Sequence, residues 1–327
     1  MKKSHEADVQ SNDHGADGTG GGPAGAITEA VLRHVAGIAE LSGATAIFVY
    51  VEALEGRPLP LPKSLKPKVY YITKTSDEDA QQRESGTAFI RVPNVPLSRL
   101  GQVKMAIFIA LSRGLISFGD TIVFLAGLVA SGTLDTIIIT QVGREYEMFS
   151  SGDDSQALPS GVRPEVILRV VDIALQLGNE GREGKPVGAL FVVGDSERVI
   201  SLSRQLILNP FKGYREEDRN ILDPALNETV KELSTVDGAF IIRGDGVIES
   251  CGAFLKTAGQ KESELPRGLG ARHHAAAAIT AVTDAIAITV SESTGTVTIF
   301  RDGGVITEID KPRPVGKSPG LPNFMSE

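Results

Sequence analysis

The sequence predicts an α/β protein built from two units, each with a β-sheet covered by helices. Its 327 residues suggest about two domains, at roughly 150 residues per domain. Short apolar runs rich in β-branched residues alternate with segments of helical periodicity, which is typical of such folds. A polar stretch rich in Ser, Asp and Gly, residues 150–155, separates the two sets. We therefore expect a small N-terminal α/β sandwich and a C-terminal α/β unit with a mixed sheet.

Composition at the chain ends and near the centre sets the expected boundaries. Residues 1–25 contain six glycines and little to bury, and the segment from Lys311 contains four prolines. Segments of this kind do not form a core. The expected organisation is a disordered leader over 1–25, a first domain over 26–147, a linker over 148–163, a second domain over 164–312 and a flexible tail over 313–327.

The first unit opens with a helix, because Ile27, Val31, Val35 and Ile38 recur at helical spacing before Gly43. The run 45–51 is apolar throughout, as in a strand covered on both faces, so we expect a partly parallel sheet. The remaining expected elements are strands at 68–73, 87–91, 120–125 and 135–140, and a helix at 97–112.

In the second unit, Pro164 suits the first position of a helix whose apolar stripe begins at Val166. Gly244 to Gly246 form a turn between two strand-like runs, which predicts a hairpin. A second hairpin ends the unit. The expected strands are 187–193, 238–243, a strand ending at 255, 285–290, 296–300 and 305–309. The expected helices are 269–283 and most of 217–233, where Pro224 must lie near a helix start or a bend.

Composition also argues against several classes of protein. The formal charge is −8 and no basic run appears, so we expect no DNA partner. The longest apolar stretch, 105–130, is interrupted by Arg113 and Asp120, and the N-terminus lacks the apolar core of a signal peptide. The single cysteine, Cys251, excludes an intramolecular disulfide framework. We expect a cytoplasmic protein without a membrane partner.

A loose pattern in the first unit is similar to a known domain. A helix is followed by residues 43–50, and later by residues 119–123, Gly127 and a closing strand. This arrangement resembles the C-terminal domain of pyruvate kinase. The resemblance implies a regulatory or oligomerisation module, or alternatively a scaffold without a ligand, and it implies no catalytic chemistry.

Asp237 and Gly238 precede a predicted strand in the second unit. A carboxylate at a strand edge can bind a divalent cation or orient a hydroxyl group. Glycine beside it allows a ligand to approach the backbone closely. The alternative is an ordinary turn, in which Asp-Gly pairs are common.

A glycine-containing loop, with Gly268 and Gly270, leads into an Ala-rich helix. Backbone amides at a helix N-terminus favour an anion, and Arg272 adds a planar charged group suited to phosphate. His273 and His274 are further possible donors. The alternative for the histidine pair is packing or solvent exposure.

Together these segments resemble the diadenylate cyclase domain, in which an Asp-Gly-Ala motif is followed along the chain by an Arg-His-Arg motif. Here Asp237-Gly238-Ala239 and Arg272-His273-His274 match in order and spacing. The resemblance covers residues 164–312, and its archaeal-type layout joins a pyruvate-kinase-C-like domain to a cyclase domain. Further segments that agree with the family are 188–191, 209–214, 283–285 and 290–295.

Three positions depart from the family pattern. His274 replaces the second arginine of the Arg-His-Arg motif, Ala271 stands where many members have Thr, and Ser293 replaces the second carboxylate after Glu292. These departures bear on rate and metal preference more than on the type of reaction.

The resemblance implies a nucleotidyltransferase that condenses two ATP into cyclic di-AMP, with Mn²⁺ or Mg²⁺, where the two subunits of a homodimer face each other. Asp237, Arg272 and His273 would be catalytic, and Asp237 and Glu292 would hold the metal. The residues expected to bind ATP are Gly188, Leu190, Gly238, Ala239, Phe240, Gly270, Ala271, Arg272, His273, His274 and Ser291. Leu190 and Phe240 also suit an ordinary core, and Glu292 also suits a solvent-exposed surface.

Two other functions fit the same residues. The departures at His274 and Ala271 suit a nucleotide-binding sensor that has lost catalysis, which would bind ATP without turnover. The second is an assembly protein in which both units only oligomerise, and such a protein would bind no adenine nucleotide.

Overall fold

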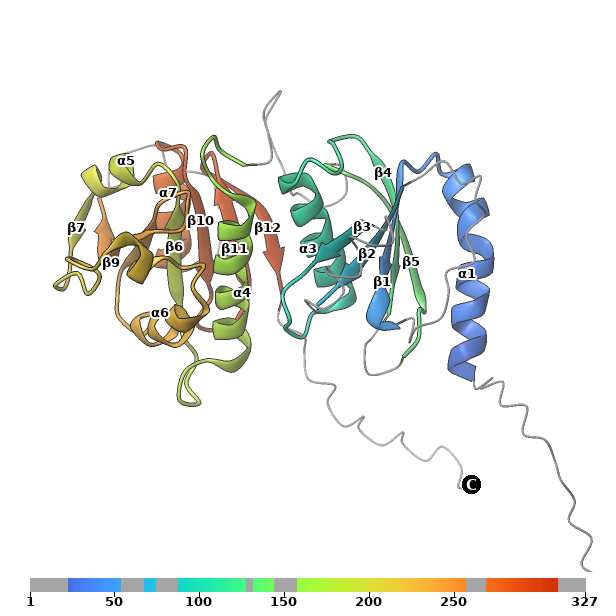
Figure 1. The fold of residues 1–327 in the computed structure, drawn as a ribbon, viewed down its shortest axis with the longest axis horizontal. Coiled ribbons are helices and arrows are strands. Elements are labelled where there is room, and N and C mark those ends of the chain that lie inside the picture. The colour runs from blue at the N-terminus through green and yellow to red at the C-terminus, as the bar shows by residue number, and fades with distance from the viewer. Residues whose placement is uncertain are drawn as a thin grey trace, which may run out of the picture.

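The computed structural model describes residues 23–53, 68–74, 88–127, 132–143, 158–256 and 269–310. Two separate sheets with helices on their faces stand side by side in Figure 1, which confirms the expected fold class. The expected leader up to residue 22, the linker up to residue 157 and the tail over 313–327 lie outside the described residues, and so does Gly268. No helix in the described part of the chain has both the length and the apolar character needed to cross a membrane.

The first sheet has the strand order β3-β2-β1-β4-β5. Its strands are β1 (Ala46–Tyr50), β2 (Lys68–Thr73), β3 (Ala88–Arg91), β4 (Thr121–Ala126) and β5 (Thr136–Gln141). The first four run parallel and β5 is antiparallel to β4, so the sheet is partly parallel as expected. The central strand β1 is buried along its whole length, since helices cover both faces of the sheet.

Helix α1 (Pro23–Leu41) covers one face of this sheet and α3 (Arg99–Ser112) covers the other, and the short 3₁₀ turn η1 (Val51–Ala53) follows β1. The helix α1 begins three residues before the expected domain start, because proline is well tolerated in the first helical turn. Its buried face also differs from the expectation. Ile27 is 47% exposed, and Thr28, Leu32, Val35 and Ala39 face the core.

The second sheet has the strand order β12-β11-β10-β6-β8-β9-β7. Its strands are β6 (Ala189–Val193), β7 (Ser203–Gln205), β8 (Ala239–Ile242), β9 (Ile248–Leu255), β10 (Ile286–Val290), β11 (Val297–Arg301) and β12 (Gly304–Ile309). Only β6 and β8 pair in parallel, so this sheet is mixed.

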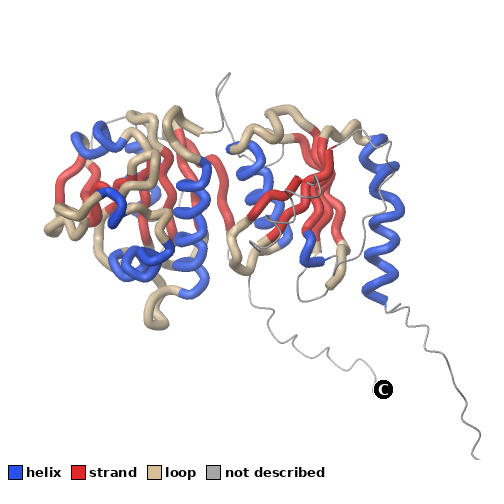
Figure 2. The backbone as a smooth tube through the Cα atoms, in the orientation of Figure 1, coloured by secondary structure: helices blue, strands red, loops and turns tan. Residues whose placement is uncertain are grey.

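Helices cover both faces of the second sheet as well (Figure 2). They are α4 (Pro164–Glu180) and α6 (Asn227–Leu233) on one face, and α5 (Ser196–Ser201) and α7 (Ala271–Thr280) on the other. The expected helix at 217–233 is interrupted: two 3₁₀ turns, η3 (Glu216–Arg219) and η4 (Pro224–Leu226), precede α6. Proline inside a helix removes a hydrogen bond and clashes with the preceding turn, which explains the break at Pro224.

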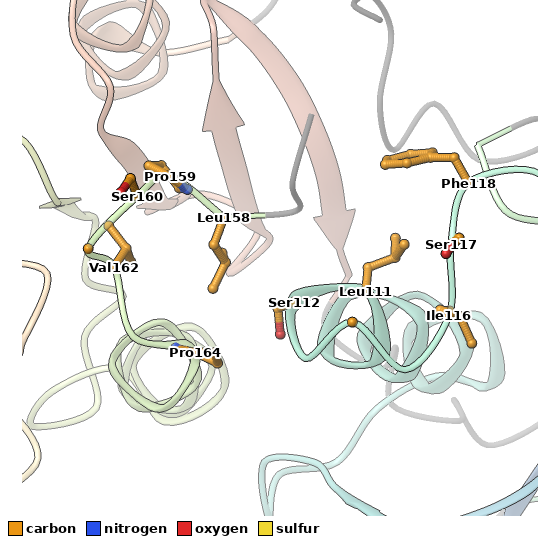
Figure 3. Close-up of a pocket in the computed structure, with 12 residues that line it drawn as sticks. Leu111, Ser112, Ile116, Ser117, Phe118, Leu158, Pro159, Ser160, Val162 and Pro164 are labelled. Carbon is orange, nitrogen blue, oxygen red and sulfur yellow. The ribbon is translucent and has the colours of Figure 1, made fainter. Parts of the chain in front are cut away.

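The two units meet where α3 contacts α4 and β12. The Nζ of Lys104 in α3 donates a hydrogen bond to the carbonyl oxygen of Glu308 in β12 at 2.9 Å. Buried apolar side chains of α3 and α4 belong to one continuous cluster. A cavity of about 540 Å³ lies at this boundary. Figure 3 shows Leu111 and Ser112 from the end of α3 on one side of it and Leu158 and Pro164 on the other.

Candidate active site

Three of the expected site segments meet at one edge of the second sheet. Gly188 precedes β6, Asp237 precedes β8, and Glu292 follows β10. The strands β6 and β8 run parallel, while β10 runs antiparallel to β6 with Val290 paired to Ala189. The starts of β6 and β8 therefore lie beside the end of β10, so these three residues share an edge.

Arg272 connects two of these segments. It lies in the first turn of α7, after Gly270, whose extended backbone (φ −80°, ψ 174°) begins the helix. Its Nη2 lies 3.4 Å from Oδ1 of Asp237, and its Nη1 lies 3.3 Å from Oε2 of Glu292. The structure thus places the expected cation between the two expected carboxylates.

Glycines allow this close arrangement. A Cβ at Gly188 would lie 2.6 Å from Nη1 of Arg272 and 3.1 Å from Cβ of Glu292, so any larger residue would displace the guanidinium. Gly238 has φ +108°, which side chains rarely adopt, and a Cβ there would lie 2.6 Å from the carbonyl carbon of Gly252. Glycine at position 238 is therefore required by tight backbone packing against Gly252 of β9.

The ion pairs of Arg272 are open to solvent. The side chains of Asp237 and Glu292 are 89% and 64% exposed, and that of Arg272 is 31% exposed. Exposed ion pairs contribute about 0–1 kcal/mol, so the guanidinium can exchange these partners for another anion at little cost. The amides of His273 and His274 donate to the carbonyl oxygen of Gly270 at 3.0 and 3.3 Å, which leaves those of Ala271 and Arg272 for an anion at this helix N-terminus.

A cavity of about 770 Å³ lies beside Arg272. This volume is within the range of small-molecule sites in proteins. Its lining includes Gly270, Ala271, Arg272, His273, Ser291, Glu292, Ser293, Thr294, Glu308 and Asp310. Most of the expected loop residues therefore share one cavity, whereas Asp237 and Gly188 lie outside its lining and adjoin it through Arg272.

Sequence reasoning missed Glu308 and Asp310 at this cavity, and it included Thr294 only as part of the segment 290–295. The pairing of β10, β11 and β12 explains why the end of β12 is near the cavity, since Val297 of β11 pairs with both Val290 and Ile309. The end of β12 therefore returns to the sheet edge where β10 ends. Asp310 accepts a hydrogen bond from Oγ1 of Thr296 at 3.3 Å, which fixes the chain there.

The two histidines of the motif have different surroundings. His273 is only 6% exposed and packs edge-on against Phe300, with ring centroids 6.0 Å apart. Burial and then the neighbouring His274 lower the pKa of His273, so its imidazole is neutral near pH 7. It can donate one hydrogen bond to a phosphate but supplies no positive charge, whereas His274 is exposed.

Leu190, Ala239 and Phe240 are buried in the core and do not line the cavity. Phe240 stacks on Phe191 with ring centroids 5.0 Å apart, so the side chain has a packing role. An adenine contact through these residues stays a prediction. The Oγ of Ser291 accepts a hydrogen bond from the amide of Thr294 at 3.3 Å, within the loop that presents Glu292.

Comparisons with known proteins show what the chain is similar to. The family described as "DisA bacterial checkpoint controller nucleotide-binding" matches residues 176–305, and the family described as "Probable sensor domain DacZ_P" matches residues 28–149. A crystal structure of DacA from Staphylococcus aureus is 24% identical with a TM-score of 0.30, and the match covers 45% of this chain and 87% of that one.

Two archaeal proteins named diadenylate cyclase are also similar. The protein of Methanocaldococcus jannaschii is 43% identical over 185 residues, and the match spans 55% of this chain and 56% of that protein. The protein of Haloferax volcanii is 36% identical over 222 residues, which span 68% of this chain and 80% of that protein. These relatives support the archaeal-type layout, while the likeness of the first unit to pyruvate kinase stays a prediction.

Proposed function

The chain belongs to the diadenylate cyclase family, and on this premise we propose that it joins two ATP molecules into cyclic di-AMP with release of two pyrophosphates. The observation that carries this proposal is the position of Arg272, with its guanidinium between Asp237 and Glu292 at 3.4 and 3.3 Å. A cation and a helix N-terminus can bind phosphate, and a carboxylate can accept a proton. Here these groups lie together at one place.

In the proposed reaction, the 3′-oxygen of each ATP attacks the α-phosphorus of the other. A new P–O bond forms, the bond to the bridging oxygen of pyrophosphate breaks, and the 3′-hydroxyl loses its proton. Asp237 orients this hydroxyl and accepts the proton, because its exposed carboxylate adjoins the phosphate-binding loop. Pyrophosphate leaves with the electron pair of the broken bond.

The loop from Gly270 to His274 holds the phosphates in this proposal. Arg272 stabilises the charge that develops on the phosphate oxygens, and the amides of Ala271 and Arg272 at the start of α7 add hydrogen bonds. The neutral imidazole of His273 lines the same cavity and donates one hydrogen bond. Catalysis by these groups is positioning and charge stabilisation, and no covalent intermediate with the protein is needed.

The carboxylates fit the Mn²⁺ or Mg²⁺ that the family implies. Within the described ranges, no group of three or more His, Cys, Asp and Glu side chains is arranged to hold a metal ion. Mg²⁺, however, is commonly bound through one or two carboxylates together with substrate phosphates. Asp237 and Glu292 supply such oxygens, with exposed fractions of 89% and 64%. When bound, the ion neutralises phosphate charge.

A symmetric product from two ATP molecules requires two sites that face each other, so we propose a homodimer or a larger homo-oligomer as the active form. An exposed apolar cluster supports this. Residues 206–208 are 40%, 38% and 95% exposed, and Phe254 is 46% exposed. A Cβ at Gly252 would lie 2.5 Å from Ile207 and 3.7 Å from the carbonyl oxygen of Asp237, so the cluster adjoins the site.

The direct test is to incubate the purified chain with ATP and Mn²⁺ or Mg²⁺ and to detect cyclic di-AMP by mass spectrometry. Asp237→Asn should nearly abolish product formation while ATP binding, measured by calorimetry, persists. The matched control is Glu29→Gln, which neutralises an exposed carboxylate on α1 in the first unit. Turnover by Asp237→Asn equal to that of the parent would remove Asp237 from the mechanism.

The nucleotide-binding sensor remains the second candidate, because an exposed His274 stands where the family has a phosphate-facing guanidinium. ATP binding with no product at any metal or pH would favour this function over the cyclase. Restoring the family residue with His274→Arg should then restore turnover if the loss of that charge is its cause. Failure to bind any adenine nucleotide would contradict both functions.

A further inference from the structure

A second cavity lies between the two units, away from the cyclase site. It has a volume of about 320 Å³, and its polar lining comes from both sides of the boundary. Arg91, Asn94 and Arg113 belong to the first unit, and Arg169 and Asp172 belong to α4 of the second. The neighbouring cavity in Figure 3 has no charged lining residue, so the two cavities differ in the ligands they suit.

The carboxylates around this cavity already have partners. Oε1 of Glu165, which also lines the cavity, lies 2.6 Å from Nη2 of Arg163. Oδ2 of Asp172 lies 3.5 Å from Nη1 of Arg169 and accepts a hydrogen bond from Gln176 at 3.1 Å. Arg163, the residue before α4, therefore balances the charge of Glu165, and Arg169 of α4 balances that of Asp172.

Arg91 and Arg113 form no ion pair within the described ranges, although Arg113 lies near enough to Glu165 to attract its carboxylate. Neither side chain forms a hydrogen bond with any residue in those ranges, and both are exposed. Arg91 ends β3, and Arg113 follows the last turn of α3, so backbone structure fixes both at the cavity. Local positive charge of this kind is notable in a chain whose formal net charge is −8.

We propose that this cavity binds a small anion with phosphate or carboxylate groups, held by Arg91 and Arg113 of the first unit where that unit faces α4 of the second. Guanidinium groups match the planar, two-oxygen geometry of both anions, and a pair of them favours a ligand with more than one negative charge. The volume is at the lower end of small-molecule sites, which limits the ligand to a compact metabolite. The site is separate from the cyclase cavity and does not depend on turnover.

Binding would connect the first unit to α4, which packs against the second sheet. A ligand that binds only the folded chain raises its melting temperature as its concentration rises. The probes are inorganic phosphate and citrate, one for each anion chemistry, added to the full-length chain. The Arg272→Gln background removes the cationic side chain of the cyclase site, so that binding there is not mistaken for binding at the boundary.

Calorimetry should then show binding of at least one probe to Arg272→Gln. Adding Arg91→Gln and Arg113→Gln should weaken that binding by about tenfold or more for each arginine removed. Arg33→Gln, which removes an exposed charge on α1, is the matched control and should bind as the parent does. The absence of binding by both probes, or equal affinity in all variants, would overturn the proposal.

Discussion

Gly188 leaves the space that the guanidinium of Arg272 occupies, since a Cβ at position 188 would lie 2.6 Å from Nη1. The backbone of Gly188 has no positive φ, so alanine would strain only side-chain contacts, those with Arg272 and with Cβ of Glu292 at 3.1 Å. Gly188→Ala should therefore fold and move Arg272 away from Asp237. Because small displacements in a catalytic site cost as much as about 100-fold in rate, we expect turnover to fall by about 10- to 100-fold.

The control for this variant is Gly37→Ala, at a helical position of α1 where a Cβ meets no atom within 4 Å. Alanine there should raise stability slightly, by about 0.5–1 kcal/mol, and leave turnover unchanged. Circular dichroism and thermal unfolding of both variants check the fold. If Gly188→Ala turned over ATP at the parent rate, the placement of Arg272 would not matter for catalysis.

His273 makes stability depend on pH. Burial keeps the pKa of its imidazole below the usual value near 6.5 in the folded chain, so the unfolded chain binds more protons as the pH falls. This contribution to stability is complete above pH 6.5 and is lost as the pH drops through that value toward the lower pKa of the folded state. Urea unfolding from pH 8 to pH 5 should show the decline.

His273→Gln removes the titrating group, so its free energy of unfolding should decline less steeply over the same pH range. His34→Gln is the matched control, because that side chain is exposed on α1 in the first unit. If the free energy of unfolding declined equally with pH in the parent and in His273→Gln, His273 would have the same pKa in the folded and the unfolded chain, contrary to this prediction.

The sequence was enough to locate most strands, and β1 to β5 each lie within one residue of the expected runs. Continuous apolar runs fix strands that are buried on both faces, because few other structures bury every residue in a row. The helix α5 and the strand β7 were not predicted. Both are short, and β7 (Ser203–Gln205) is a polar edge strand that pairs only with β9, so neither has a periodic signal.

For the site, motif order indicated which residues belong together but not how they contact each other. The ion pairs of Arg272 with Asp237 and Glu292 depend on strand directions in a mixed sheet, which residue spacing does not determine. Asp310 lines the cavity because of hairpin register, and its own neighbours along the chain give no sign of it. The burial of Phe240 also depends on its pairing with Phe191 of the neighbouring strand β6, on which the ring stacks on one face of the sheet.

Lys104 connects the first unit to the wall of the cyclase cavity through its hydrogen bond to the Glu308 carbonyl at 2.9 Å. Lys104→Met keeps the length of the side chain and removes this bond. A hydrogen bond to a charged group contributes about 1.5–3 kcal/mol, so thermal unfolding should show a loss of that order. Lys68→Met, at an exposed end of β2, should change stability by less than about 0.5 kcal/mol. Equal effects of the two substitutions would contradict a specific role for Lys104.

Phe240 tests whether adenine is bound by the core aromatic residues. Its side chain is 2% exposed and stacks on Phe191, so Phe240→Leu should lower the free energy of unfolding by about 1–3 kcal/mol. Since the ring does not line the cavity, KM for ATP should stay within about twofold, a change of less than 0.5 kcal/mol. A rise in KM of tenfold or more would instead place the adenine against this ring.

Cys251 should be unreactive until the second unit opens. The thiol is 1% exposed, and burial raises its pKa to about 12, so almost no thiolate is present at pH 8. It is also the only cysteine of the chain, so every labelling event reports this one position. An aromatic disulfide reagent should label the native protein only slowly, and urea should accelerate labelling in step with loss of circular dichroism. Stoichiometric labelling of the native chain within seconds would show that β9 is accessible in the folded state.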